Sequence, residues 1–459
     1  MPGTPREIWA EIMNRFDPER VPPREWRAER DESPATKIVH ALNRQTASPE
    51  KVLLLGTVGS GKSTELYRIA EARAQKGDEF VIVFDLVRHF QTVVGDVQAL
   101  QHVSSWEVCF LAGLALIRAA KDQLGYDFPP DLQSQLAEAW TGLARASQVQ
   151  GSAPPSIDIL AVIKSLSLTV SGAAVPVAAA LGAPATAGAL AAGGLKVLSE
   201  IAGAGKWTLP IGRKGTKRLD DQDELMTTLV DKVNLLLGAF QGYNRRVLMI
   251  IDGLDRVTDI EHAKALFLHS QMIARLDCAL VVCAPFVLRN EKAVTEARVF
   301  RLRTLHNVPV MDHADPRKHG PGVAFLGEVF RRRVRDLGAE SFVPLPLLDK
   351  LAYYSGGLLR DFVKSIGMLA ERGVDDNASV VTAAHVDDVI KEARQLVEIG
   401  MHRGDIDLLH AIVKDPDHRL PDGKIARELL TSSRLLPYPN ESEWFYPHPL
   451  LTLSLVRVQ

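Results

Sequence analysis

The sequence predicts an α/β protein in which a parallel β-sheet core is followed by a helical lid and a C-terminal winged helix. Short apolar runs separated by helical-looking segments predict a parallel sheet that is covered on both faces. From residue 320 to 400 the hydrophobic pattern is helical, and from about 404 the order is helix, turn, helix and two short strands. The four apolar runs are 52–55, 80–84, 247–251 and 279–282.

Residues 56–63, between the first apolar run and the helix after it, match the whole phosphate-binding pattern G-x-x-x-x-G-K-[ST]. The glycines let backbone N–H groups turn inward around phosphates, and the helix N-terminus adds positive potential. Lys62 can reach the β- and γ-phosphates, and the Ser63 hydroxyl can bind Mg²⁺. The sequence therefore predicts an ATP and Mg²⁺ site, and we call residues 56–63 the phosphate loop. The predicted nucleotide contacts are Gly56, Thr57, Val58, Gly59, Ser60, Gly61, Lys62, Ser63 and Thr64.

The third apolar run ends in a carboxylate, Asp252, which predicts the second half of the site. In phosphate-loop enzymes an aspartate in this place holds Mg²⁺, usually through water. Ser63 and Asp252 are therefore the predicted metal ligands. Asp255 lies three residues further on and is a candidate for polarising the attacking water. Ordinary turn chemistry is the alternative for an aspartate at the end of a strand.

The segment 250–256, which reads Ile-Ile-Asp-Gly-Leu-Asp-Arg, resembles the Walker B segment of STAND and KAP ATPases, signalling relatives of the AAA+ group. NACHT members of STAND carry a similar Asp-Gly-Leu-Asp, and KAP members a similar Leu-Asp-Arg. The segment 355–361, Ser-Gly-Gly-Leu-Leu-Arg-Asp, is similar to the sensor-2 segment of AAA+ lids. The resemblance implies a catalytic role for Lys62, Asp252 and Arg360, with Arg360 reporting whether the γ-phosphate is present. A surface ion pair is the alternative for Arg360.

The chain departs from the AAA+ pattern directly after Asp252. AAA+ enzymes usually have a glutamate at the next position, where this chain has Gly253. The departure favours slow hydrolysis, as in a switch. Two further likenesses are to STAND proteins: residues 26–30 precede the core as their adenine-recognition segment does, and His448 resembles their ADP-sensing histidine. Packing among neighbouring aromatic side chains is the alternative for His448.

We expect four segments along the chain, and an apolar insertion at about 150–215 within the second of them. In this insertion, residues 165–195 carry no charged side chain and are numerous enough to span a bilayer once. Three interpretations stay open: a buried or mobile insertion, a membrane-contacting segment, and a partner-binding helix. The four segments are an N-terminal segment 1–50, an ATPase core 51–310, a helical lid 320–400 and a winged helix 401–459.

The composition gives the chain no strong overall charge. Its 54 Lys and Arg residues against 56 Asp and Glu residues give a net charge of −2, which does not draw the chain to nucleic acid. Residues 401–459 hold seven Lys and Arg and eight Asp and Glu, which favours a protein-facing or nucleotide-closing winged helix over a DNA-binding one. Three cysteines without metal-ligand spacing, and a first stretch without an apolar secretory segment, predict a cytoplasmic location.

These observations lead to one main hypothesis and two alternatives. The main hypothesis is a switch of the STAND/AAA+ type that binds and slowly hydrolyses ATP, forms a homo-oligomer and controls a separately encoded effector protein. The resemblance to prokaryotic relatives adds a role in anti-phage (antiviral) defence. The alternatives are a KAP-like ATPase that associates with a membrane through residues 165–195, and a DNA-binding, initiator-like ATPase.

Overall fold

The computed structural model describes residues 3–44, 48–91, 96–146, 168–171, 220–243, 246–296, 299–439 and 443–456. The contacts between residues divide the chain into two compact units. One, which we call the sheet unit, consists of residues 34–55 and 65–303. The other, the helical unit, consists of residues 1–33, 56–64 and 304–459. The expected N-terminal segment is thus divided between the units, and the phosphate loop belongs by its contacts to the helical unit.

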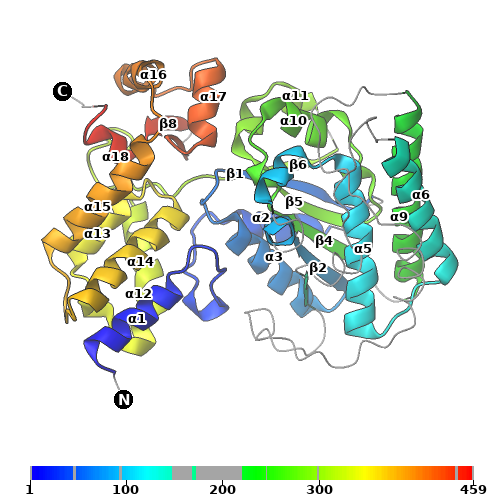
Figure 1. Ribbon diagram of the computed structural model, residues 1–459, viewed down its shortest axis with the longest axis horizontal. Coiled ribbons are helices and arrows are strands. Elements are labelled where there is room, and N and C mark those ends of the chain that lie inside the picture. Colours follow the sequence, from blue (N-terminus) through cyan, green and yellow to red (C-terminus); the bar gives the residue numbers. More distant parts are fainter. Residues whose placement is uncertain are drawn as a thin grey trace. The chain divides into compact units, whose positions relative to one another are not determined.

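A six-stranded sheet forms the centre of the sheet unit, with the strand order β3-β2-β4-β5-β1-β6 (Figure 1). Five strands form a parallel sheet, and β3 pairs antiparallel with β2 at one edge. The predicted fold class is therefore confirmed, and each of the four predicted apolar runs lies in a strand. The strands are β1 (Lys51–Gly56), β2 (Glu79–Asp85), β3 (Leu168–Ser171), β4 (Arg246–Asp252), β5 (Ala279–Pro285) and β6 (Arg301–Leu305).

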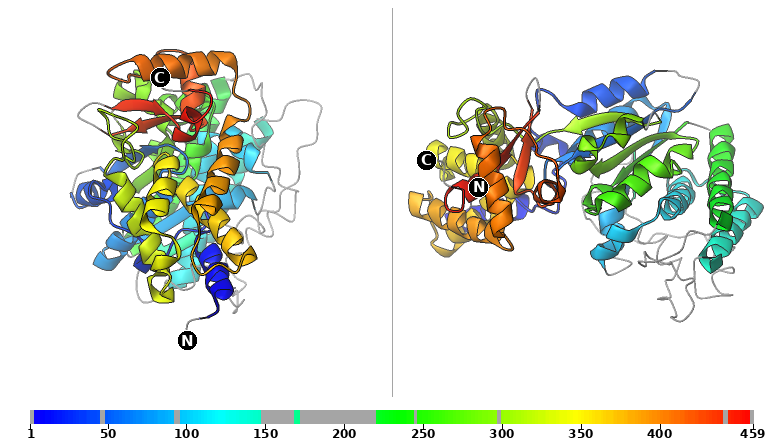
Figure 2. Two further views of the ribbon diagram at one scale, coloured as in Figure 1. Left: turned by 90° about the vertical axis from the view of Figure 1, so that its left-hand side faces the viewer. Right: turned by 90° about the horizontal axis from the view of Figure 1, so that it is seen from above.

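Helices pack on this sheet and on one another. Helices α5 and α9 lie side by side, α5 also contacts β2 and β3, and α6 packs along α9 (Figure 2). Their buried apolar side chains and those of the strands form one continuous core. The helices are α2 (Pro34–Leu42), α3 (Lys62–Lys76), α4 (Leu86–His89), α5 (Ser105–Leu124), α6 (Pro130–Ala146), α9 (Asp220–Tyr243), α10 (Ile260–Lys264) and α11 (Ala293–Glu296).

Strand β3 is the part of the uncharged tract 165–195 that falls within the described residues. It pairs with residues 81–84 of β2. The three interpretations of the remaining tract, and of the insertion at 150–215 outside β3, concern residues that the structure does not describe. Among the residues that it does describe, no helix combines the length and the apolar character needed to cross a membrane.

The helical unit has its own core, built from the N-terminal helix and the lid helices. Trp9 of α1 is fully buried, and its indole N–H donates a hydrogen bond of 2.7 Å to the Ala378 carbonyl. Gly373 makes this packing close, because a Cβ atom there would lie 2.5 Å from the Trp9 ring. The helices before the winged helix are α1 (Pro5–Arg15), α12 (Gly322–Val334), α13 (Leu345–Tyr354), α14 (Leu359–Asp375) and α15 (Ala383–Glu398).

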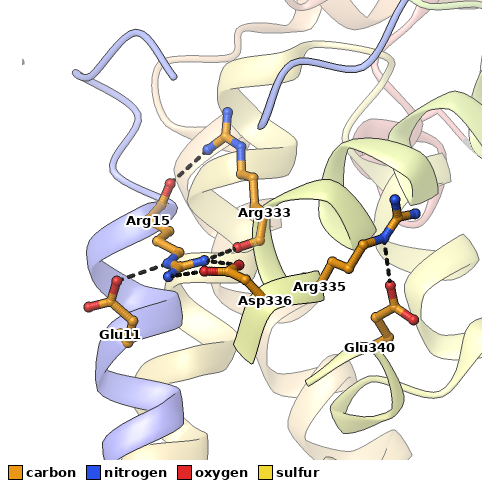
Figure 3. Close-up of polar contacts among 6 residues, drawn as sticks. All are labelled: Glu11, Arg15, Arg333, Arg335, Asp336 and Glu340. Atoms are coloured by element: carbon orange, nitrogen blue, oxygen red, sulfur yellow. Dashed lines mark hydrogen bonds and ion pairs between the residues drawn. The ribbon is translucent and has the colours of Figure 1, made fainter. Parts of the chain in front are cut away.

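Two arginines join the C-terminal ends of α1 and α12 reciprocally (Figure 3). The Arg15 guanidinium donates to the Arg333 carbonyl at 2.8 Å, and the Arg333 guanidinium donates to the Arg15 carbonyl at 2.9 Å. Arg15 also forms a two-pronged ion pair with Asp336. Burial lowers the pKa of Arg333 to about 10, and its guanidinium lies 4.9 Å from the Phe16 ring centroid. Each cation therefore satisfies a carbonyl group at the negative end of the other helix.

The winged helix has the predicted order of elements. Strands β7 and β8 pair antiparallel, from Leu435 opposite Pro447 to Tyr438 opposite Trp444. Three residues of the predicted turn, 440–442, lie outside the described residues. The elements are α16 (Arg403–Lys414), α17 (Lys424–Thr431), β7 (Leu435–Tyr438), β8 (Trp444–Pro447) and a short α18 (Pro449–Thr452).

Candidate ATP site

The phosphate loop connects the end of β1, at Gly56, to the start of α3, at Lys62. Gly59 and Gly61 have φ angles of 87° and 103°, a backbone conformation that favours glycine. The Lys62 side chain is 4% exposed, and its Nζ donates to the carbonyls of Gly56 at 2.8 Å and Thr57 at 2.6 Å. The loop is therefore a compact turn at the N-terminus of α3, the arrangement that suits a phosphate group.

Three further predicted contact residues are placed by the same turn. The Ser60 hydroxyl donates to the Thr57 carbonyl at 2.9 Å, which closes the loop on itself. The Thr57 hydroxyl donates to the side-chain oxygen of Asn307 at 2.5 Å. Asn307 follows β6 and is 1% exposed, and no sequence motif drew attention to it. Ser63 is the second residue of α3, as its predicted role as a metal ligand requires.

The start of α14 is in direct contact with the phosphate loop, within the helical unit. The backbone N–H of Arg360 donates to the Gly59 carbonyl at 3.1 Å. A Cβ atom at Gly61 would lie 2.5 Å from the Leu359 side chain, and one at Gly59 would lie 3.0 Å from the Arg360 Cβ. The residue that the sequence singled out as sensor 2 is thus located at the loop, and its backbone makes the contact.

The N-terminal segment also reaches the loop. The Arg30 guanidinium donates to the Ser60 carbonyl at 3.3 Å and to the His306 carbonyl at 3.4 Å. It lies 5.5 Å from the ring centroid of Phe325 on α12. The expected adenine-recognition segment, 26–30, therefore ends beside the phosphate loop, and its role in base recognition stays a prediction.

The second predicted half of the site lies in the sheet unit, at the end of β4. Asp252 is 8% exposed, and one of its carboxylate oxygens accepts a hydrogen bond of 2.8 Å from the Gly253 N–H. Asp255 and Arg256 follow in the short turn 254–256 and are half-buried. Among the described residues, no group of three or more Asp, Glu, His or Cys side chains could hold a metal ion. Ser63 in the helical unit and Asp252 in the sheet unit each offer an oxygen donor of the kind that Mg²⁺ takes.

The backbone conformation of Gly253 and the close approach of Val87 leave no room for a side chain at this position. The φ angle of Gly253 is 96°, and a Cβ atom there would lie 2.8 Å from Val87 Cγ2 and 3.0 Å from the Val87 nitrogen. The short helix α4 thus occupies the space in which a side chain after Asp252 would begin. A glutamate at this position, as in the AAA+ pattern, would therefore require α4 to move.

A carboxylate that sequence reasoning missed, Asp85, lies at the end of the neighbouring strand β2. It pairs in register with Asp252, and one of its oxygens accepts a hydrogen bond of 3.0 Å from the Arg88 N–H at the start of α4. Burial raises the pKa of the Asp85 carboxyl, and the nearby Arg88 and Arg256 oppose the rise. A signal was present in the sequence, because residues 80–85 are an apolar run ending in aspartate, like residues 247–252.

His448 packs against the segment before α14. The side chain is 1% exposed, its Nδ1 accepts a hydrogen bond of 3.3 Å from the Leu450 N–H, and its Nε2 lies 3.6 Å from an Asp361 carboxylate oxygen. The neighbouring Tyr438 hydroxyl donates to the Gly356 carbonyl at 2.8 Å. The winged helix therefore holds both ends of the segment 356–361. An ADP-sensing role for His448 stays a prediction.

Comparisons with known proteins give likenesses to solved structures alone. No protein-family model and no curated protein matches the chain. The Aeropyrum pernix ORC2 protein in its ADP form is 12% identical, with 95% of this chain and 94% of that chain covered and a TM-score of 0.42. The A. pernix ORC1 protein in complex with DNA is 12% identical, with 97% of each chain covered and a TM-score of 0.39. At TM-scores below 0.5 these likenesses carry no functional weight, so the function must be inferred from the residues of this chain.

Proposed function

We propose that this chain is an ATP-binding and ATP-hydrolysing conformational switch of the AAA+/STAND type. The observation that supports it most directly is the hydrogen bond from the Arg360 N–H of α14 to the Gly59 carbonyl of the phosphate loop. A phosphate bound by the loop acts on the loop backbone, so the start of α14 responds to the presence of the γ-phosphate. Mg²⁺, when bound, neutralises charge on the β- and γ-phosphates, and Ser63 and Asp252 are the residues that would hold it.

The winged helix extends this response, because it contacts the segment that leads into α14. Tyr438 contacts Gly356, just before α14, and His448 lies 3.6 Å from Asp361 in the first turn of α14. A shift of the segment on ATP binding or hydrolysis therefore changes what the winged helix can contact. We infer that the winged helix presents this change to a separately encoded effector protein and that ATP promotes a homo-oligomer. A role in antiviral defence is part of the same proposal.

The test combines ATP binding, turnover and size. Lys62→Ala removes a cation that contacts two phosphates, so ATP affinity should fall about 100-fold or more, given 1.5–3 kcal/mol for each charged hydrogen bond. Asp252→Ala should keep most of the ATP affinity and lose at least about 100-fold in Mg²⁺-dependent turnover.

The size of the wild-type protein tests the switch itself. The wild type should elute from a sizing column as a larger species with ATP or a non-hydrolysable analogue than with ADP. An unchanged elution volume in all three nucleotides would contradict the switch.

Three exposed cations of the winged helix are paired with carboxylates, which favours a protein partner over DNA. Arg419 lies 2.8 Å from Asp417, Lys424 lies 3.5 Å from Glu428, and Arg403 lies 4.0 Å from Asp407. Phosphate binding needs cations that can exchange small counterions for DNA, and these three already have carboxylate neighbours. Binding of the full chain to duplex DNA at low and high salt tests the initiator-like alternative. A salt-sensitive micromolar affinity would replace the protein-facing role by DNA binding.

The membrane-associated alternative depends on the uncharged tract. Deleting residues 172–195 removes most of the tract and leaves strand β3, which ends at Ser171, in place. Flotation of the full chain and the deletion variant with liposomes compares them directly. Equal flotation of the two proteins would exclude membrane contact through this tract, and flotation of the full chain alone would favour it.

A further inference from the structure

Two carboxylates lie on neighbouring strands where the strands of the sheet end. Asp85 ends β2 and Asp252 ends β4, and the two are directly paired in the parallel register. Neighbouring strands lie about 4.8 Å apart, and paired residues project from the same face of the sheet. Both carboxylates therefore lie at the carboxyl ends of strands, where open α/β sheets bind their ligands.

The position directly after Asp252 cannot supply a second carboxylate. Val87 of α4 lies where a side chain at Gly253 would begin, and the backbone of Gly253 is in a conformation that other residues rarely adopt. Helix α4 itself starts directly after Asp85, which is its N-cap. The same short helix thus blocks the usual position and holds a carboxylate on the neighbouring strand.

From this arrangement we propose that Asp85 is a catalytic residue that orients the attacking water during ATP hydrolysis, an inference that rests on the proposed function. The Asp85 carboxylate accepts a hydrogen bond from the water and directs a lone pair of its oxygen at the γ-phosphorus. The new bond forms between the water oxygen and that phosphorus, and the bond to the bridging oxygen breaks, releasing ADP. The protons of the water end on the phosphate product and in solvent, so no further reactant is needed.

The alternative is that Asp85 does no more than cap α4 through the Arg88 N–H. Substitution of Asp85 by asparagine distinguishes capping from catalysis. Asn and Asp are about equally good N-caps, whereas a neutral amide is a poorer hydrogen-bond acceptor for water than a carboxylate. Asp85→Asn should therefore leave the melting temperature within about 2 °C and ATP affinity within about 3-fold of the wild type. Its kcat should fall by about 100-fold, within the range for removal of one positioned catalytic group.

A matched control comes from another aspartate N-cap of the sheet unit. Asp259 accepts a hydrogen bond of 2.7 Å from the His262 N–H at the start of α10 and is exposed. Asp259→Asn should change neither turnover nor stability. Asp255→Asn tests the carboxylate that the sequence favoured, and its effect on kcat should be smaller than that of Asp85→Asn.

The outcomes distinguish this inference from the proposed function. If the wild type hydrolyses ATP and Asp85→Asn does so at the same kcat, Asp85 is a cap alone and the inference is wrong. A larger loss in Asp255→Asn than in Asp85→Asn would also overturn it, since the water would then be held by Asp255. If the wild type binds ATP without hydrolysing it, both the inference and the hydrolytic part of the proposed function are wrong.

Discussion

The two predicted halves of the candidate site are built by different kinds of contact. One is the phosphate loop, and the other is the end of β2 and β4 with Asp85 and Asp252, which we call the Asp252 edge. The loop is held within the helical unit by backbone carbonyls: Gly59 accepts from Arg360, and Ser60 accepts from Arg30. The Asp252 edge lies in the sheet unit, and the register of β2 and β4 positions its two carboxylates. One half therefore depends on single hydrogen bonds from other segments to a loop, and the other on the register of two paired strands of one sheet.

The difference shows where a switch can be built. A backbone hydrogen bond between a loop and the start of a helix is a small contact that a bound phosphate can shift. Paired strands buried in a continuous core resist such a shift, because moving one residue disturbs the whole register. We infer that the helical unit carries the response to nucleotide and that the sheet carries the chemistry.

The largest expected effect concerns the anchoring of α1 in the helical unit. Trp9→Ala removes a fully buried indole from its contact with Gly373 and leaves the Ala378 carbonyl without its donor. A buried Trp→Ala change costs about 3–5 kcal/mol. The helical unit should therefore unfold at lower temperature, while amides of the sheet strands keep their protection in hydrogen exchange.

Met13→Ala is the matched control for Trp9→Ala. Met13 lies on the same helix and is 42% exposed, so its loss should cost about 0.5 kcal/mol or less. Equal loss of exchange protection in both units after Trp9→Ala would contradict the comparison, since the two halves of the site would then depend on one cooperative structure.

A smaller effect is expected at Gly253 in the sheet half. Gly253→Ala adds a methyl group 2.8 Å from Val87 in a left-handed backbone, and strain and overpacking together should cost about 3 kcal/mol. Gly77→Ala is the control, because Gly77 has a φ of 73° and nothing within 4 Å of an added Cβ. It should cost about 1 kcal/mol, the strain alone. Thermal unfolding of the two variants measures the difference, and equal costs would mean that α4 gives way.

Gly253→Glu restores the AAA+ pattern in sequence and tests the same contact by activity. The added side chain cannot take the usual position while α4 remains in place, so turnover should not rise above that of the wild type. A faster ATPase in Gly253→Glu would show that the edge of the sheet is easily rebuilt. The contrast between a shiftable loop and a rigid edge would then be lost.

The sequence was most informative where local pattern decides the structure. The phosphate loop and the four buried strands follow from short-range spacing, and each was predicted in place. Strand β6 was missed because three of its five residues, Arg301 to Leu305, are charged or polar, as an edge strand allows. Asp85 was missed because its importance comes from the strand register, which a single segment does not show. Helix α1 was missed because Trp9 finds its partner on α14, far along the chain.

A pH dependence of stability is expected in helix α5 of the sheet unit. Glu107 is 3% exposed, forms a capping box with Ser104, and burial raises its pKa to about 8 from an ordinary value of 4.5. Between these values the folded state keeps the proton and the unfolded state releases it, so the free energy of unfolding falls as pH rises from about 4.5 to about 8. Glu107→Gln stays neutral at every pH and removes this fall. The variant should match the wild type near pH 4.5 and be more stable than the wild type at pH 8, in denaturant unfolding at both pH values.

Glu7→Gln is the control for Glu107→Gln, because Glu7 closes the capping box of α1 and is exposed. Glu7→Gln alters the same kind of helix start without changing a buried carboxyl group. It should therefore not show the gain in stability at pH 8 that is expected of Glu107→Gln. A wild type whose stability stays flat from pH 5 to pH 8, with no gain in Glu107→Gln, would mean that water reaches the Glu107 carboxyl. The start of α5 would then open as readily as the loop contacts of the helical unit, and the rigidity assigned to the sheet half would hold for its strands alone.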